Sequence, residues 1–164
     1  MFEHSEFVGS FKLENQEINK FSVNTKEASY VSKFKYITSL VISVFNKTKG
    51  QYEIDCVDEC ALHLDDVCVY ACFNYEDIVH TQLAMFPSST IKKHILIPFS
   101  STLLQSPPKV SGMIDFSKLD NVYITLKLKQ QYVEDLENEY ECFISITKLA
   151  TLHCSGGYFK IKEH

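Results

Sequence analysis

Alternation of apolar and polar side chains with a period of two residues is the feature that most limits what this chain can fold into. The clearest run covers residues 122–129, where four aliphatic residues alternate with tyrosine, threonine and lysine. Successive side chains of a β-strand point to opposite faces, so this run predicts an antiparallel strand with one buried and one solvated face. Helical spacing is scarce, and only residues 51–60 and 76–85 are expected to hold a helical turn or two.

Similar segments follow one another along the chain, separated by turn residues such as Asp65-Asp66 and Ser155-Gly156-Gly157. In residues 33–45, the side chains expected on one face are Phe34, Tyr36, Leu40, Ile42 and Val44, and those expected on the other face are Lys35, Ile37, Ser39, Val41 and Ser43. The remaining expected strands are residues 7–11, 18–23, two short strands within 61–73, 140–151 and 158–161. About eight closely spaced strands are typical of an all-β sandwich or barrel. We therefore predict an all-β fold, a single eight-stranded antiparallel jelly roll built as a two-sheet β-sandwich.

The length of 164 residues suits one domain, and no composition break suggests a second. We expect residues 1–20 to form an N-terminal arm or first strand, and residues 21–164 to form the jelly-roll domain. A formal charge of −5 argues against direct nucleic-acid binding, which needs a surplus of Lys and Arg. Without a signal-peptide pattern or an apolar run of about 20 residues, we expect a soluble protein made in the cytoplasm, with no membrane-spanning segment.

The cysteines raise the question of a metal site. Cys56, Cys60, Cys68 and Cys72 form two C-x3-C pairs, with His63 between them. Thiolates and imidazoles are the usual ligands of zinc, so these four cysteines are candidate metal ligands. The spacing is a loose match to the tight C-x2-C knuckle, and Cys in a strand behaves as a small hydrophobe. We therefore favour free structural thiols, and expect no metal and no other cofactor.

Motifs of catalysis are absent from the sequence. There is no glycine-rich phosphate loop and no Gly-x-Ser-x-Gly elbow, and the six histidines lack i, i+4 metal spacing. A Cys–His pair that meets only in space stays open as an alternative. The acidic residues between 134 and 141 are interpreted as an exposed loop. We therefore expect no catalytic residues and no enzyme.

Residues 95–122 carry a family resemblance. Ile97-Pro98-Phe99-Ser100 is followed by a Pro-containing link, then by Ser111-Gly112, and then by residues 114–122 with the sequence IDFSKLDNV. This order resembles the second jelly roll of the double-jelly-roll major capsid proteins of nucleocytoplasmic large DNA viruses. Weaker similarities continue in the same chain order from about residue 37 to the C-terminus. The resemblance implies structural roles for Ser111, Gly112, Phe116, Ser117, Asp120 and Asn121.

Four of these six residues have a physical basis for their roles. Gly112 follows two prolines at a sharp turn, where a residue without Cβ is favoured. Phe116 is expected to anchor its loop in the core. Asp120 and Asn121 precede a strand, where short polar side chains hydrogen-bond to nearby backbone.

The resemblance implies a structural capsid subunit of an icosahedral large DNA virus, assembled in the host cytoplasm and located in the virion capsid. Since one domain replaces the family's tandem pair, we expect a self-assembling single-jelly-roll penton at the vertices. The partners would be further copies and neighbouring capsid proteins, with proximity to an inner viral membrane allowed. The aromatic-rich residues 70–75 and 85–87 could supply the contacts. Two alternatives stay open: a trimer-forming half or paralogue of the major capsid protein, and a non-viral jelly roll that binds carbohydrate or a receptor.

Overall fold

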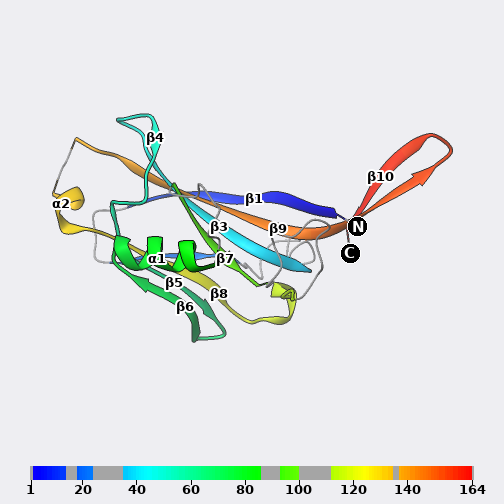
Figure 1. Cartoon of the computed structure of the whole chain (residues 1–164), viewed down its shortest axis with the longest axis horizontal. Helices are drawn as coiled ribbons and strands as arrows, with labels where there is room; N and C mark the ends of the chain where they lie inside the picture. The colour runs from blue at the N-terminus through cyan, green and yellow to red at the C-terminus, as the bar shows by residue number, and fades with distance from the viewer. Residues whose placement is uncertain are drawn as a thin grey trace.

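The computed structural model describes residues 2–13, 18–23, 35–85, 93–99, 112–134 and 137–163. Within these ranges the chain forms ten strands, two α-helices and one short 3-10 helix (Figure 1). The strands are β1 (Phe2–Lys12), β2 (Asn19–Ser22), β3 (Ile37–Asn46), β4 (Gln51–Tyr52), β5 (Val57–Leu64), β6 (Val67–Phe73), β7 (His94–Pro98), β8 (Val122–Leu128), β9 (Tyr140–Ser155) and β10 (Tyr158–Glu163). The helices are α1 (Tyr75–Met85), the 3-10 helix η2 (Phe116–Lys118) and α2 (Gln130–Val133).

The strands form two antiparallel sheets. The smaller sheet has the order β2-β8-β5-β6, and the larger has the order β1-β9-β3-β4, with β7 also paired to β3 and β10 to β9. Two four-stranded sets, β1-β9-β3-β7 and β2-β8-β5-β6, make up an eight-stranded jelly roll. The predicted fold is therefore confirmed, and β4 and β10 are additions to it.

The core lies between the two sheets. Along β8 the apolar residues Val122, Ile124, Leu126 and Leu128 are buried, and the residues between them are partly exposed, as the alternation predicts. Strands β3 and β9 of the other sheet supply the facing layer, which includes Ile42 and Ile144. Burying each aliphatic side chain of this kind contributes about 1.5–3 kcal/mol to folding. This double layer is the main source of stability.

The face expected for the start of β3 is wrong at two positions. Tyr36 is 41% exposed, whereas Ile37, expected on the opposite face, is fully buried. The pairing of β3 with β9 shifts register between Ile37 and Ser39, which is a β-bulge. One extra residue in a strand reverses the face of every side chain before it. Phe34 lies outside the described residues.

The two helical expectations had different outcomes. The segment 76–85 lies within α1, whose first turn is capped by Asn74, since its Oδ1 accepts the Asp77 N–H at 2.9 Å. The segment 51–60 is not helical, and that expectation is wrong. It contains β4, a turn and the start of β5, because Tyr52 pairs with Phe45 across a hairpin.

The N-terminal strands belong to the sandwich. β1 pairs with β9 along its whole length, and β2 pairs with β8 in the other sheet. The domain boundary expected after residue 20 therefore falls inside β2. No helix among the described residues is long and apolar enough to span a bilayer.

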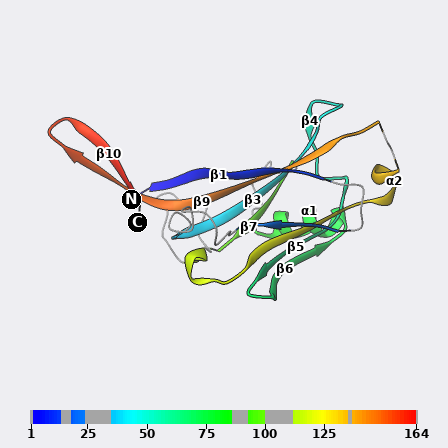
Figure 2. The ribbon, with the colours of Figure 1, turned by 180° about the vertical axis from the view of Figure 1, so that it is seen from behind.

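At the C-terminal end, β9 runs past the sandwich and returns as β10. The two strands form a hairpin that projects from the body in both views (Figures 1 and 2). Gly156 and Gly157 form its turn, with φ of 58° and 81°. Two successive residues with positive φ are typical of the type I′ turn, which matches the twist of a hairpin.

Candidate functional site

The segment that carries the family resemblance connects the two sheets. Ile114 forms an isolated bridge with Ile37 of β3, in which each backbone N–H donates to the other carbonyl at 2.9 Å. The chain then passes through η2 and enters β8 of the smaller sheet. The segment therefore joins the larger sheet to the smaller one at one end of the core.

Phe116 holds this connection in the core. Its side chain is fully buried and meets Phe99 edge-on, with ring centroids 5.9 Å apart. Asp115 caps η2, because its Oδ1 accepts the Ser117 N–H at 3.0 Å and also the Ser117 hydroxyl. The Asp-Phe-Ser order of the motif therefore makes one capped turn around one buried ring.

Asp65 holds the backbone of Asp120 and Asn121, the polar pair that precedes β8. Both of these backbone N–H groups donate to Asp65 Oδ1, at 2.7 and 2.9 Å. The N–H of Asp65 donates in turn to the Asn121 carbonyl at 2.8 Å. The β5–β6 turn thus clamps the start of β8. Gly112 is half-buried, and Ser111 lies outside the described residues.

The four candidate zinc ligands do not come together. Cys60 and Cys72 face each other across β5 and β6 and are buried, whereas Cys68 is exposed. Burial raises the pKa of the Cys56 thiol to about 12 and raises that of Cys60 further. Metal binding requires the thiolate, which such burial disfavours. The structure therefore describes these cysteines as separate free thiols.

A different group with metal-binding chemistry was not predicted. Glu53, Asp55 and Cys56 place their ligand atoms within 4.8 Å of one another. Glu53 is already engaged by Asn46 Nδ2 at 2.9 Å and by Lys49 Nζ at 3.5 Å. Burial alone would raise the pKa of Glu53, but these contacts outweigh it and the pKa lies below its ordinary value. The group therefore serves as a polar support for the β3–β4 hairpin.

One described pair resembles a nucleophile and its base. Ser43 Oγ and His94 Nδ1 lie 2.7 Å apart on neighbouring strands β3 and β7. Burial, together with the nearby Lys93, lowers the pKa of His94. A catalytic pair also needs a third group that orients the base, and the described contacts place the Tyr52 ring beside His94. We therefore interpret the Ser43–His94 pair as a cross-strand hydrogen bond beside an aromatic ring.

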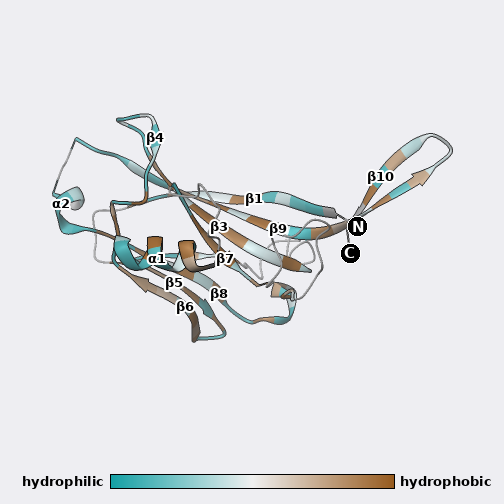
Figure 3. Cartoon of the chain, viewed as in Figure 1, coloured by the Kyte–Doolittle hydropathy of each residue, from teal (hydrophilic) through white to brown (hydrophobic). Residues whose placement is uncertain are grey.

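Two surfaces expose large apolar side chains. The first is β6, where Val67, Val69 and Phe73 are exposed, and Figure 3 colours this strand towards the hydrophobic end. The second is the β9–β10 hairpin, with Leu152, Tyr158, Phe159 and Ile161. Contiguous exposed apolar residues are typical of interaction sites. They are therefore the candidate contact surfaces of this molecule.

The same arrangement of sheets occurs in known structures. VP54 of the virus PBCV-1, in a structure fitted into a reconstruction of the virophage Sputnik, superposes on 97% of the chain with a TM-score of 0.70. The chain has the jelly-roll fold of viral capsid proteins. Sequence identity in this viral jelly roll is only 12%, and a comparison with protein families and curated sequences finds no match.

Two further structures show the same fold. A chain of the PBCV-1 virus capsid covers 98% of the sequence with a TM-score of 0.62 and 11% identity. The major capsid protein P2 of bacteriophage PM2 covers 95%, with a TM-score of 0.52 and 9% identity. The chain spans about half the length of each of these proteins, namely 50%, 51% and 46%.

Proposed function

We propose that the chain is a structural capsid subunit of an icosahedral DNA virus, which assembles with copies of itself and with neighbouring capsid proteins. The observation that carries this proposal is the superposition of nearly the whole chain on viral capsid proteins. The apolar surfaces on β6 and on the hairpin provide contacts for neighbours. Assembly would take place in the host cytoplasm, with the virion capsid as the destination.

The role we favour is that of a single-jelly-roll penton. The single jelly roll observed spans about half the length of the matched capsid proteins, which supports a subunit built on one such domain. A subunit at a fivefold vertex needs a ring of five identical contacts, and a heterologous contact between copies gives such a ring when each copy is rotated by one fifth of a turn. Catalysis and cofactors have no part in this role.

The half-length match also favours a second candidate, in which the chain is one half or a reduced paralogue of a major capsid protein and forms trimers. Native mass spectrometry of the purified chain separates the two roles. A penton predicts a mass of five 18.9 kDa chains, whereas the second candidate predicts three. A chain that stays monomeric at every concentration would contradict both.

A further inference from the structure

β6 is an open edge of the smaller sheet. It pairs with β5 on one side, and no described strand pairs with its other side. Its sequence, VCVYACF, has no charged residue and no proline, which are common means of protecting an edge strand from pairing. Its one irregularity is a bulge at Val69, the extra residue between the Leu62–Tyr70 and His63–Cys68 pairs. Val67 is 61% exposed. Helix α1 packs against the C-terminal end of the strand, where Cys72 Sγ lies 3.8 Å from Thr81 Oγ1. The Val67 end therefore offers unpaired backbone beside apolar side chains.

The β9–β10 hairpin has a strand, β10, that it can donate to another sheet. Among the described strands β10 pairs with β9 alone, so its outer edge is also open. The hairpin projects from the body as a two-stranded ribbon (Figures 1 and 2). Two strands alone are marginally stable in water, and a third strand or a covering surface stabilises them.

The hairpin has two chemically different faces. Cross-strand pairing places Phe159 beside Cys154 and Ile161 beside Leu152, so these four residues share an apolar face. The other face includes Lys160, which pairs with His153. Phe159 is 73% exposed. One face is therefore suited to apolar contact and the other to an acidic neighbour.

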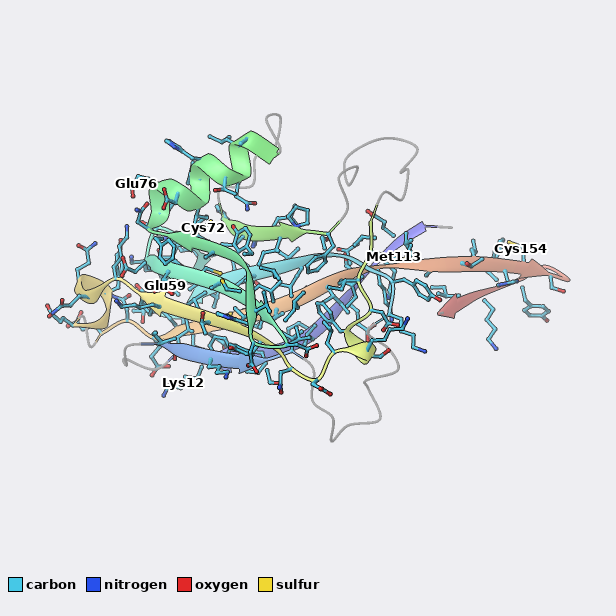
Figure 4. All side chains as sticks on the ribbon, turned by 90° about the horizontal axis from the view of Figure 1, so that it is seen from below. Lys12, Glu59, Cys72, Glu76, Met113 and Cys154 are labelled. Atoms are coloured by element: carbon cyan, nitrogen blue, oxygen red, sulfur yellow. The ribbon has the colours of Figure 1, made fainter. Side chains whose placement is uncertain are left out.

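The surroundings of β6 are acidic. Asp65 and Asp66 precede the strand, and Glu76 and Asp77 follow it at the start of α1. Glu59 lies opposite Phe73 on β5. The exposed Lys160 of the hairpin complements these carboxylates. Figure 4 places Glu59 and Glu76 at one end of the molecule and Cys154 at the other, so the hairpin meets β6 only on another copy.

We propose that the β9–β10 hairpin of one copy adds to the open edge of β6 in the next copy, so that β10 extends the smaller sheet. Backbone hydrogen bonds would supply affinity in such a strand addition, and the alternate side chains would supply specificity. The contact joins two different surfaces, so its repetition gives a ring when the rotation between copies closes and an open filament when it does not. This inference rests on the proposed self-assembly and names the surfaces that perform it.

Two native cysteines test the contact directly. Cys68 on β6 and Cys154 on the hairpin are exposed, whereas the other four cysteines are buried. A bifunctional maleimide is added to a mixture of 15N-labelled and unlabelled chains, and cross-linked peptides are identified by mass spectrometry. We expect a Cys68–Cys154 link between labelled and unlabelled copies, and its loss in Cys154→Ser. A product linked only through two Cys154 residues would overturn the proposal, because it shows hairpin-to-hairpin contact.

Substitutions on each surface test the same contact without cross-linking. Val69→Lys puts a charge on the edge strand, and Lys160→Glu reverses the cation of the hairpin. Each is expected to raise the concentration at which the oligomer half-dissociates by about tenfold or more. Leu83→Lys is the matched control, since Leu83 is an exposed apolar residue on α1, and it should change that concentration less than about twofold.

Two results with the wild-type chain distinguish failure of the hairpin contact from failure of self-assembly. An oligomer that lacks the Cys68–Cys154 link and dissociates unchanged in Val69→Lys and Lys160→Glu would overturn the hairpin contact and leave self-assembly standing. A wild-type chain that is monomeric at every concentration by mass photometry would overturn the proposed self-assembly and this contact with it.

Discussion

Phe116 is the residue at which the family motif and the physical core coincide. Its ring is fully buried against Phe99, so truncation leaves a cavity where two sheets are joined. Phe116→Ala should lower the free energy of unfolding by about 3–5 kcal/mol, measured by urea denaturation. Met113→Ala, an exposed position in the same segment, should change it by less than about 0.5 kcal/mol. An unchanged midpoint for Phe116→Ala would show that the ring does not anchor this loop.

Asp65 acts through its carboxylate rather than through its turn conformation. Asp65 and Asp66 both have positive φ, 48° and 67°, but the amides of Asp120 and Asn121 donate to Asp65. Asp65→Ala should therefore lower the free energy of unfolding by about 1–3 kcal/mol more than Asp66→Ala does. Thermal unfolding of the two variants isolates this difference, because alanine is equally strained at both positions. Equal losses would mean that the clamp contributes no stability.

Such residues show the limit of sequence reasoning about the site. The sequence identified Asp120 and Asn121 as a polar pair before a strand, but their partner Asp65 lies 55 and 56 residues away, and only the sheet order brings the two turns together. Lys148 is a similar case. It follows Ile144 and Ile146 on the buried face of β9 and pairs with Glu6 of β1 at 2.5 Å. A local pattern does not reveal the neighbouring strand that makes a buried charge acceptable.

At the scale of elements, period-two alternation predicted strands where one face is buried and the other solvated. β8 is such a strand and was predicted within one residue. β1 runs over Phe2–Lys12 and is longer than the expected strand 7–11. The alternation did not reveal its full length, because the strand mixes polar residues with glycine and shifts register near Gly9. The bulge in β3 reversed the faces of Tyr36 and Ile37. Bulges and mixed strands depend on their partners, so the pattern alone does not show them.

The hairpin strand was predicted, but its projection from the body was not, because exposure depends on which strands continue beside it. Among the aromatic residues expected to make contacts, Phe73 is exposed on β6, whereas Tyr70 and Tyr75 are half-buried. The sequence therefore identified part of the candidate contact surface without showing that β6 is an edge.

The hairpin should behave as a separate unit of stability. Gly157 has φ of 81° and a Cβ there has open space, so Gly157→Val is penalised by backbone conformation rather than by a clash. This substitution should destabilise the hairpin by about 1–2 kcal/mol, so that the hairpin opens locally while the sandwich stays folded. Hydrogen exchange should therefore accelerate at the amides of His153 and Lys160, which the two-residue turn places in a hydrogen-bonded pair, and stay unchanged at Ile124. Acceleration at Ile124 as well would show that the hairpin and the core unfold together.

At the scale of the whole molecule, buried thiols make stability fall in alkali. Burial raises the pKa of both Cys56 and Cys142 from about 9 to about 12. Unfolded thiols lose protons above about pH 9 while the folded ones keep theirs, so the stabilisation is complete below pH 9 and is lost towards pH 12.

Each of these two thiols should lower the free energy of unfolding by about 2 kcal/mol between pH 8 and pH 10.5, as measured by chemical denaturation. Cys142→Ala is the control, because alanine does not titrate. Between pH 8 and pH 10.5 its free energy of unfolding should fall by about 2 kcal/mol less than that of the wild-type chain. A variant with the same pH dependence as the wild-type chain would rule out the linkage.

The most direct test of the capsid assignment is a cryo-EM reconstruction of purified particles that contain this chain. We expect the jelly-roll domain, recognised by its projecting β9–β10 hairpin, to fit five times around each fivefold vertex. Its placement in the capsomers on the faces would instead support the trimeric alternative. Shells that contain no density for this domain, and that lose the chain on washing, would contradict the claim that it is a capsid subunit.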